Sequence, residues 1–416
     1  MTASRELTAV GDEALLEQMG TGILPQLPSQ VYEDRFSRCR ALMAERGLAV
    51  LIVYSGAMPF QACEWARYFA NYVHPYWNGE AFIVIPHEGE PALLINYGFM
   101  LDVARETGPI KDVRSPVERF GAASRYAGLK EALQQILEER GVARGPVGLS
   151  FSGGQGDWSP APLRPLFDDL LAGVEVQDAA DLLTALILKK SAFDLELTRA
   201  ASVIASEGMQ AAFETMEEGG RESDAYLAFQ RAVIEAGADS PLFHYISQSG
   251  PSAHIALRPL AATGRRLRRG DLFLIDAGIC FRGYYADITR TAAIGELSEA
   301  GSRLYAATEE VVEEMVAELR PGVRAGRIAE ILFDGIQRRG YTRTHPLIGH
   351  GIGTFVNEPP FVMPWNDFVI EEDMVINLEP AIYDPVVGGV RIEDPYLITA
   401  AGAERLTTIS QECYIA

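Results

Sequence analysis

Hydrophobic and polar positions alternate with two different periods in the first part of the chain. A charged, amphipathic stretch over residues 31–46 predicts a helix, and the apolar run at 48–54 predicts a buried strand. The same alternation continues with predicted strands at 81–86, 91–97 and 147–150 and a predicted helix at 127–139. Strands that alternate with helices are typical of an α/β domain with a mainly covered sheet. We expect this domain to span residues 1–185.

The pattern changes after about residue 190. Helices are predicted at 191–218, 223–236, 298–319 and 325–339. Ser191 can cap the first of them, and strand-like apolar runs lie between the second and third helices and after the fourth. We therefore expect residues 186–416 to form an α+β domain, in which helices pack on one side of a curved antiparallel sheet.

The 416-residue chain carries a net charge of −21 and is 48% hydrophobic. This excess of acidic side chains argues against nucleic acid or an anionic membrane surface as a partner, because neither offers positive charge. No apolar window is long enough to span a membrane, and the N-terminus lacks the regions of a signal peptide. Its four scattered cysteines, without a CxxC pair, fit a reducing compartment. We expect a cytoplasmic protein that binds neither nucleic acid nor membrane.

Two aspartates interrupt an apolar stretch between residues 272 and 291, LFLIDAGICFRGYYADITRT. The stretch predicts two short strands joined by a tight turn at Arg282 and Gly283, with Asp276 near the end of the first strand and Asp287 on the second. A carboxylate in an apolar strand is costly to bury unless a cation pairs with it. The aspartates therefore indicate a metal site, or alternatively each one ends a strand at a turn, where Asp is common.

Three later stretches repeat this placement of a polar side chain in apolar surroundings. LIGHGIG sets His350 between glycines, which let the backbone approach closely and expose the imidazole. Glu379 ends the apolar run in NLEP, and Glu393 lies within the strand-like GGVRIED. With the two aspartates they give four carboxylates and one imidazole, a set that suits a pair of divalent ions. The alternative is a lone histidine in a glycine turn beside strand-end acids paired with arginines such as Arg290 and Arg391.

An oxygen-rich ligand set with one nitrogen favours Mn, Co or Fe(II), and Zn would also fit. Two such ions, about 3.5–4 Å apart, would hold a bridging water and lower its pKa until hydroxide forms near neutral pH. We therefore predict two divalent metal ions as the cofactor.

Taken in order, the candidate ligands resemble the metal-binding set of the pita-bread-fold enzymes, which include methionine aminopeptidase, aminopeptidase P, prolidase (Xaa-Pro dipeptidase) and creatinase. The sequences IDAG, YADITRT, GHGIG, NLEP and GGVRIED carry the likeness over roughly the second half of the chain. KKSAFDLELTRAAS and the two-domain layout are similar to the prolidase and creatinase branch. The resemblance implies that five side chains bind two metals in a pita-bread C-terminal domain: Asp276, Asp287, His350, Glu379 and Glu393. It also implies that Asp287 and Glu393 bridge the ions and that Glu379 handles the proton of the attacking water.

The resemblance further implies a homodimer, in which the neighbouring N-terminal domain closes the active site. The aromatic segment EWARYFANYVHPYWN at 64–78 would then bring His74 to the substrate. Packing in the core and in turns is the alternative for its aromatic side chains, since aromatic residues dominate protein cores.

The residues that surround the substrate in proline-specific relatives are changed here. Those relatives have an HY pair upstream of the first metal aspartate, where this chain has Leu257 and Arg258, and the nearest histidine is His254. Their VHE sequence is replaced by VNE, with Asn357 in place of the histidine. Asn357 can donate a hydrogen bond but cannot change charge, whereas Arg258 can bind a carboxylate bidentately. Alternatively, His254 or His345 replaces a missing histidine.

We therefore predict a dinuclear-metal hydrolase of a C–N bond, resembling Xaa-Pro dipeptidase or aminopeptidase, that acts on a dipeptide or a small anionic molecule. The candidate substrate-binding residues are His74, His254, Arg258, His345, Asn357 and Arg391. The alternative is a non-peptidase member of the fold, either a creatinase-like small-molecule hydrolase or a metal-dependent lyase such as a dimethylsulfoniopropionate lyase. A catalytically silent binding protein on the same scaffold would hold no metal.

Overall fold

The computed structural model describes residues 27–58, 61–62, 64–73, 79–116, 128–153, 156–157, 163–255 and 263–416. The chain divides into two compact units, Met1–Ile187 and Leu188–Ala416. Each unit has buried apolar clusters of its own. Among the helices of these described residues, none is both long enough and apolar enough to cross a membrane.

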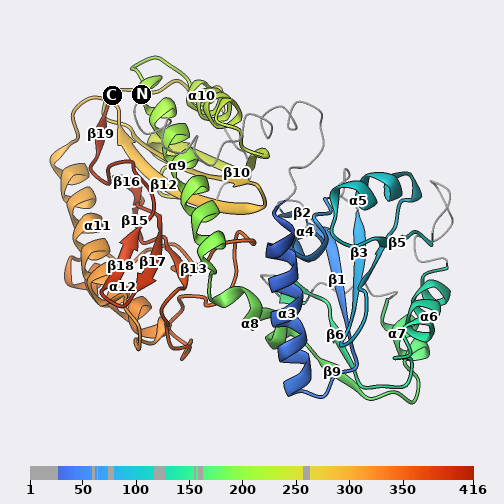
Figure 1. The fold of residues 1–416 in the computed structure, drawn as a ribbon. Coiled ribbons are helices and arrows are strands. Elements are labelled where there is room, and N and C mark those ends of the chain that lie inside the picture. The colour runs from blue at the N-terminus through green and yellow to red at the C-terminus, as the bar shows by residue number, and fades with distance from the viewer. Residues whose placement is uncertain are drawn as a thin grey trace. The chain divides into compact units, whose positions relative to one another are not determined.

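Unit 1 is built on a seven-stranded mixed sheet (Figure 1). The strand order is β5-β4-β3-β1-β6-β9, with β2 paired to β1. The strands are β1 (Val50–Met58), β2 (Gln61–Ala62), β3 (Glu80–Pro86), β4 (Ala92–Ile95), β5 (Asp112–Arg114), β6 (Val147–Ser150) and β9 (Val176–Asp178), with a separate pair β7 (Ser152–Gly153) and β8 (Gly156–Asp157). The helices are α3 (Ser29–Glu45), α4 (Glu64–Ala70), the 3-10 turn η1 (Gly98–Met100), α5 (Leu101–Thr107), α6 (Leu129–Glu139), α7 (Leu163–Leu170) and α8 (Ala180–Leu188).

Helices cover both faces of the unit 1 sheet. Leu133 of α6 and Phe167 of α7 pack in one cluster with Val50 and Ile52 of β1. Helix α3 lies on the other side of the sheet from α6 and α7 (Figure 1). Every residue of β3 is buried, as expected for a strand between two helical layers. The α/β organisation predicted for this part of the chain is confirmed.

Unit 2 contains two four-stranded sheets and a separate hairpin. The sheet orders are β10-β11-β12-β19 and β13-β14-β17-β18, and β15 pairs with β16. The strands are β10 (Ser240–Ser249), β11 (Leu272–Phe281), β12 (Tyr284–Ala293), β13 (Gly349–Gly351), β14 (Val375–Leu378), β15 (Ala381–Asp384), β16 (Gly388–Arg391), β17 (Asp394–Thr399), β18 (Gly402–Arg405) and β19 (Tyr414–Ile415). The helices are α9 (Ala192–Glu214), α10 (Glu222–Glu235), the 3-10 turn η2 (Gly250–Ser252), α11 (Glu299–Glu318) and α12 (Ala325–Arg338).

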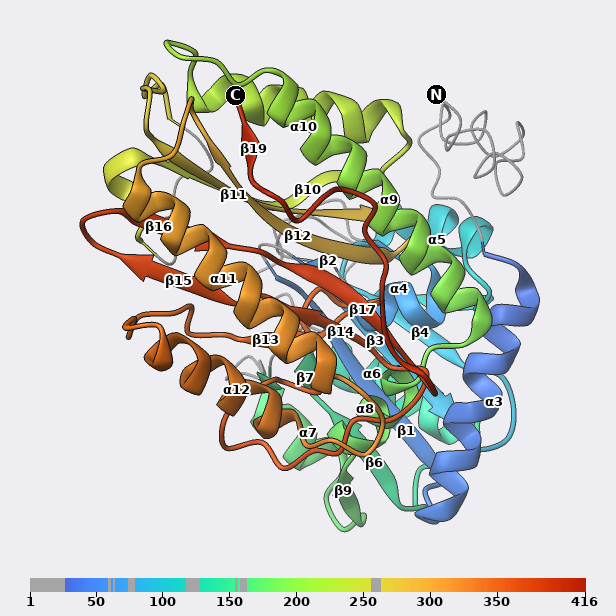
Figure 2. The same ribbon diagram turned by 90° about the vertical axis from the view of Figure 1, so that its left-hand side faces the viewer.

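Each sheet of unit 2 has its own pair of helices. Phe213 of α9 and Phe229 of α10 pack in one cluster with Phe273 and Ile288 of the first sheet. Residues of α11 and α12 join a second cluster with β14, β16 and β17, and Figure 2 shows these two helices side by side. The α+β class is confirmed, but the single curved sheet that we expected is divided in two. An isolated β-bridge between Thr289 and Glu393 joins the halves.

The start of α9 follows the sequence prediction. The Ser191 side chain accepts a hydrogen bond from the Asp194 backbone, and the Asp194 side chain accepts one from the Ser191 backbone. This reciprocal capping box satisfies backbone N–H groups that have no partner within the helix. The chain therefore enters unit 2 through a well-defined helix start.

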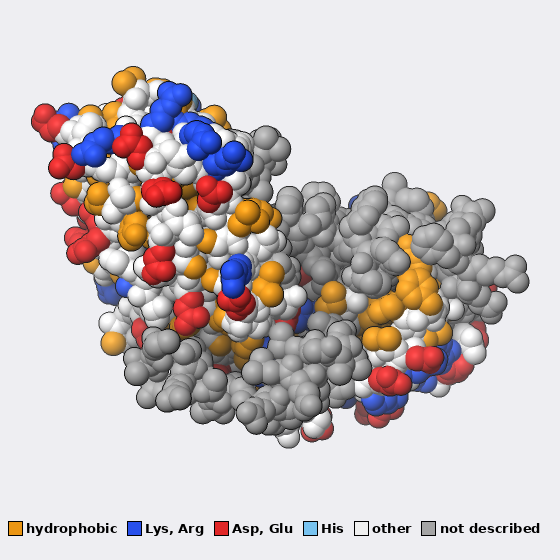
Figure 3. All heavy atoms as spheres, turned by 90° about the horizontal axis from the view of Figure 1, so that it is seen from above, with side chains coloured by type: hydrophobic (Ala, Val, Ile, Leu, Met, Phe, Trp, Pro, Cys, Tyr) orange, Lys and Arg blue, Asp and Glu red, His pale blue; other side chains and the backbone are white. Residues whose placement is uncertain are grey.

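Charged side chains of both signs are interspersed on the face of unit 2 drawn in Figure 3, with apolar side chains scattered between them. Such mixing is usual for a solvated protein surface, because isolated exposed apolar residues are common. The excess of acid in this chain is therefore not gathered into one continuous patch on that face.

Candidate metal centre

A tight hairpin positions the two aspartates. Arg282 and Gly283 join β11 to β12, and both have positive φ angles, of 51° and 86°. In the ladder Asp276 lies opposite Thr289 and Gly278 lies opposite Asp287. Because paired residues share a face and side chains alternate along a strand, Asp276 and Asp287 point to the same side of the sheet.

Both aspartates lie inside long strands. β11 continues for five residues beyond Asp276, and β12 continues for six beyond Asp287. The alternative in which each aspartate ends a strand at a turn is therefore wrong. Both side chains are buried, and a strand-end explanation cannot account for that burial.

The other candidate ligands come from the second sheet and from the loops beside it. His350 lies in β13 opposite Asn377 of β14, and Glu379 follows β14 directly. Glu393 lies between β16 and β17, where its backbone pairs with Thr289 of the first sheet. The pairing with Thr289 brings Glu393 beside Asp276 and Asp287 of the first sheet.

The structure brings three candidate ligands into direct proximity. One ligand atom each of Asp287, His350 and Glu393 lies within 4.8 Å of the other two. The Glu379 Oε1 atom is 3.9 Å from His350 Nε2. The Asn377 side-chain amide donates a 2.6 Å hydrogen bond to Glu393 Oε1, which fixes that carboxylate.

Arg391 is the cation within this cluster of acids. Its fully buried guanidinium donates hydrogen bonds to Asp276 Oδ2 and, at 3.1 Å, to Thr289 Oγ1. Its Nη1 atom lies 3.9 Å from Glu379 Oε2. The arginine-paired alternative is thus correct for Asp276. Arg290 instead pairs with Asp394 at 2.6 Å, which lies outside the candidate ligand set.

One guanidinium is not enough charge for four buried carboxylates. Burial raises the pKa of Glu379 to about 8, despite the opposing charge of Arg391, and burial followed by repulsion from neighbouring acids raises the pKa of Glu393 to about 8. The pKa of Asp287 is also raised well above its ordinary value, by burial and then by Glu393. Such groups must take up protons or cations.

The donor set fits divalent metal ions. It offers carboxylate oxygens and one imidazole nitrogen, as Mn, Co, Fe(II) or Zn sites do. Glu379 Oε1 accepts no hydrogen bond from the described residues, although it is buried. A cation at this atom would satisfy it and would restore the ionised form of the carboxylates around it.

Two of the candidate substrate residues, Arg391 and His345, lie within this centre. His345 Nδ1 lies 3.0 Å from Glu379 Oε2 and 2.7 Å from the Leu347 carbonyl. Burial, followed by the charge of Arg391, lowers the pKa of His345 to about 4. Asn357 is half-buried in the segment that follows His350.

Among His74, His254 and Arg258, only His254 belongs to the described residues. His254 is half-buried after η2 and makes no hydrogen bond or ion pair to other described residues. His74, Leu257 and Arg258 lie outside the described residues. Sequence reasoning missed Asn377 and Thr289, which hold Glu393. The signal for Asn377 was present, because it lies two positions before Glu379 in an otherwise apolar run and therefore on the same side of the strand.

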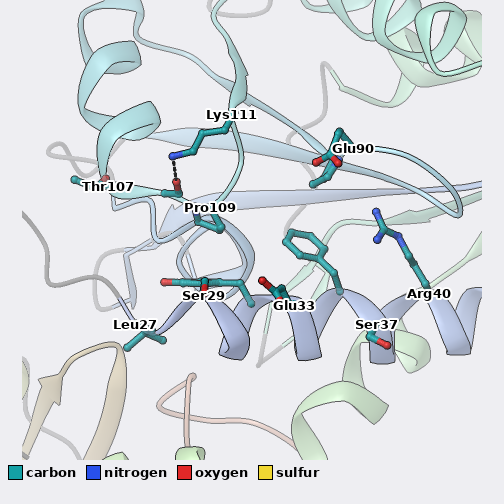
Figure 4. Close-up of a pocket in the computed structure, with 13 residues that line it drawn as sticks. Leu27, Ser29, Glu33, Ser37, Arg40, Glu90, Thr107, Pro109 and Lys111 are labelled. Atoms are coloured by element: carbon teal, nitrogen blue, oxygen red, sulfur yellow. Dashed lines mark hydrogen bonds between the residues drawn. The ribbon is translucent and has the colours of Figure 1, made fainter.

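Unit 1 has a separate hollow of about 700 Å³ beside α3 (Figure 4). It contains no candidate ligand. Its Arg40 donates hydrogen bonds to the carbonyls of Pro86 and Gly89, and its Lys111 donates to that of Gly108. Because backbone oxygens already satisfy both cations, we assign no chemistry to this hollow.

Comparison with known proteins identifies the family. The model of metallopeptidase family M24 matches residues 196–400, and that of the creatinase/prolidase N-terminal domain matches residues 35–186. A Xaa-Pro dipeptidase of Pyrococcus furiosus is 35% identical over 240 residues, which cover 57% of this chain and 68% of the relative.

Solved structures are similar over both units. The prolidase from Pyrococcus horikoshii has a TM-score of 0.74 at 26% identity, over 91% of this chain and 99% of that one. The X-Pro aminopeptidase from Thermotoga maritima has a TM-score of 0.79 at 21% identity, over 92% and 99%, which shows the fold alone. The predicted pita-bread fold is confirmed. The chain belongs to metallopeptidase family M24, a family of metal-dependent hydrolases, and carries a creatinase/prolidase-type N-terminal domain.

Proposed function

We propose that the chain is a dinuclear-metal hydrolase that cleaves the C–N bond of an Xaa-Pro dipeptide or a similar small, anionic substrate. The convergence of Asp287, His350 and Glu393 within 4.8 Å is the observation that carries the proposal. The relative at 35% identity, whose name is Xaa-Pro dipeptidase, supports the substrate class.

Five side chains would hold the two ions: Asp276, Asp287, His350, Glu379 and Glu393. Asp287 and Glu393 are proposed to bridge them. Bound there, the ions would polarise a water molecule and the carbonyl of the scissile bond.

Glu379 is the proposed proton carrier. Its carboxylate takes a proton from the attacking water and passes it to the leaving nitrogen, as a general base and then a general acid. Two neighbours orient it, because His345 Nδ1 lies 3.0 Å from Oε2 and Arg391 Nη1 lies 3.9 Å from the same atom. Since Nδ1 faces two oxygen atoms, the neutral imidazole carries its proton there. His345 therefore positions Glu379 and leaves its Nε2 atom as an acceptor.

Hydrolysis of Gly-Pro and Ala-Pro with added Mn(II) or Co(II) tests the proposal. We expect turnover that a chelator abolishes and that Glu379→Gln lowers by at least 100-fold, the lower end of a general acid–base contribution. Turnover that persists after complete metal removal would refute the metal mechanism. Failure on every proline dipeptide in the metal-loaded protein would remove the peptidase assignment.

Asn357 favours a second candidate function. An amide cannot change charge, so it cannot replace an imidazole that shifts a proton during peptide hydrolysis. This observation supports a non-peptidase activity of the same centre on a small anionic molecule, either hydrolysis or elimination. Reaction in ¹⁸O-labelled water separates the two, because hydrolysis incorporates the label into product and elimination does not.

We further propose that the chain acts as a cytoplasmic homodimer. Light scattering coupled to size-exclusion chromatography should give twice the 45.5 kDa mass of one chain. A monomer in that measurement would refute the assembly without affecting the proposed metal chemistry.

A further inference from the structure

The segment from Gly351 to Glu358, called here loop 351–358, directly follows the candidate ligand His350. Its two ends are joined by reciprocal backbone hydrogen bonds, from Gly351 N to Glu358 O at 2.7 Å and from Glu358 N to Gly351 O at 2.9 Å. The carbonyl of Gly353 accepts a 2.7 Å hydrogen bond from the backbone of Tyr285. The loop is therefore closed at its ends, continuous with His350 at Gly351, and attached in its middle to the strand that carries Asp287.

A buried ion pair between Lys190 and Glu358 fixes the C-terminal end of this loop. Lys190 Nζ contacts Glu358 Oε1, and the two side chains are 4% and 0% exposed. The backbone of Lys190 is itself fixed, because its N–H donates to the Asp373 carbonyl at 2.8 Å. Gly353 leaves the space that the lysine needs, since a Cβ there would lie 2.8 Å from Lys190 Cε.

We propose that Lys190 is a positioning residue of the metal centre. Through Glu358 it fixes loop 351–358, and the loop in turn fixes the backbone of His350 and the place of Asn357. The proposal rests on the proposed metal centre, and it adds a residue that no metal-ligand pattern contains.

The neighbouring lysine provides a matched control. Lys189 Nζ pairs with Glu371 Oε2 at 2.6 Å, but those side chains are 55% and 51% exposed. An exposed pair contributes little, whereas a buried charge without its partner distorts its surroundings. Lys190→Met should therefore disturb the loop, and Lys189→Met should not.

Calorimetric titration of the metal-free protein with Co(II) measures the effect without any assay of activity. We expect Lys190→Met to weaken Co(II) binding by about 10- to 100-fold, as substitution of outer partners of metal ligands does, and Lys189→Met to leave it unchanged. The double variant Lys190→Met/Glu358→Gln removes both charges, so it should recover folding stability while Co(II) binding stays weakened.

Two outcomes overturn the inference. Wild-type Co(II) affinity in folded Lys190→Met would show that the pair does not act on the centre. Recovery of affinity together with stability in the double variant would show a purely structural role. If the wild-type protein binds no Co(II), the proposed metal centre is refuted, and this inference falls with it.

If the protein hydrolyses a dipeptide, kcat/KM of single and double variants tests whether Lys190 acts through loop 351–358. Lys190→Met should lower kcat/KM, and adding it to Asn357→Ala should cause less further loss than it causes alone, because both changes act on one loop. If the losses of kcat/KM from Lys190→Met and Asn357→Ala add in full, Lys190 does not act through Asn357.

Discussion

Arg290→Met removes a buried guanidinium that holds the backbone of the candidate ligand Glu393. Arg290 is 1% exposed and pairs with Asp394 at 2.6 Å. It also donates hydrogen bonds of 2.8 Å to each of the carbonyls of Thr289, Glu393 and Ser410. Methionine fills similar space but leaves Asp394 as a buried charge without this cation, and it leaves four carbonyls without this donor, including that of Ile409 at 3.4 Å.

The expected loss of stability follows from these contacts. Removing one partner of a buried ion pair costs about 3–5 kcal/mol. A buried carbonyl that loses its donor costs about 1–3 kcal/mol, but neighbouring terms do not add in full. We therefore predict that Arg290→Met lowers the free energy of unfolding of unit 2 by at least about 3 kcal/mol, a large part of the usual 5–15 kcal/mol.

Urea unfolding followed by circular dichroism and tryptophan fluorescence measures this loss. Arg199→Met is the matched control, because Arg199 pairs with Glu404 at 2.7 Å while the side chains are 40% and 49% exposed. The control should lose no more than about 1 kcal/mol. A loss below about 1 kcal/mol for Arg290→Met would refute the assignment of Arg290 as the anchor of this region.

Three further predictions address the centre itself. Asn377→Ala removes the 2.6 Å hydrogen bond to Glu393, so we expect about 10- to 100-fold weaker Co(II) binding by calorimetry, and unchanged binding would contradict a role in holding that carboxylate. Because burial raises the pKa values of Glu379 and Glu393 to about 8 from an ordinary 4.5, these two acids favour the folded, metal-free protein most below about pH 4.5, and their contribution is lost as the pH rises towards 8. Urea midpoints in chelator should fall over that range, whereas a flat profile would contradict the burial of these acids. Gly351→Ala places a methyl group against the Pro359 carbonyl oxygen and 2.8 Å from the Glu358 carbonyl oxygen, so we expect a loss of about 1–3 kcal/mol in urea unfolding. Gly264→Ala should cause no loss, because no atom of the described residues lies within 4 Å of the added methyl group.

The candidate ligands could be predicted from the sequence because each one breaks an apolar run. Asp276, Asp287 and Glu379 stand out among Leu, Ile and Val without any knowledge of the fold. Hydrophobic periodicity likewise predicted the long helices, because it extends over many turns. Local patterns of this kind depend only on neighbours in the chain.

The partners of these residues depend on contacts between distant segments. Arg391 binds Asp276 across 115 positions, and Lys190 pairs with Glu358 across 168. The bridge between Thr289 and Glu393 that joins the two sheets is of the same kind. No period in the sequence encodes such pairs. The sequence therefore offered Arg391 both as a substrate residue and as a possible partner of an unspecified acid, and it did not single out Lys190.

Five side chains of unit 2 are proposed to hold two divalent ions. Protein loaded with Co(II), freed of excess metal by gel filtration and analysed by plasma mass spectrometry tests it directly. We expect two ions per wild-type chain and fewer in His350→Ala, with both proteins folded by circular dichroism. A folded wild-type protein that retains no metal, or a His350→Ala variant that retains as much as wild type, would show that these side chains do not form the metal site.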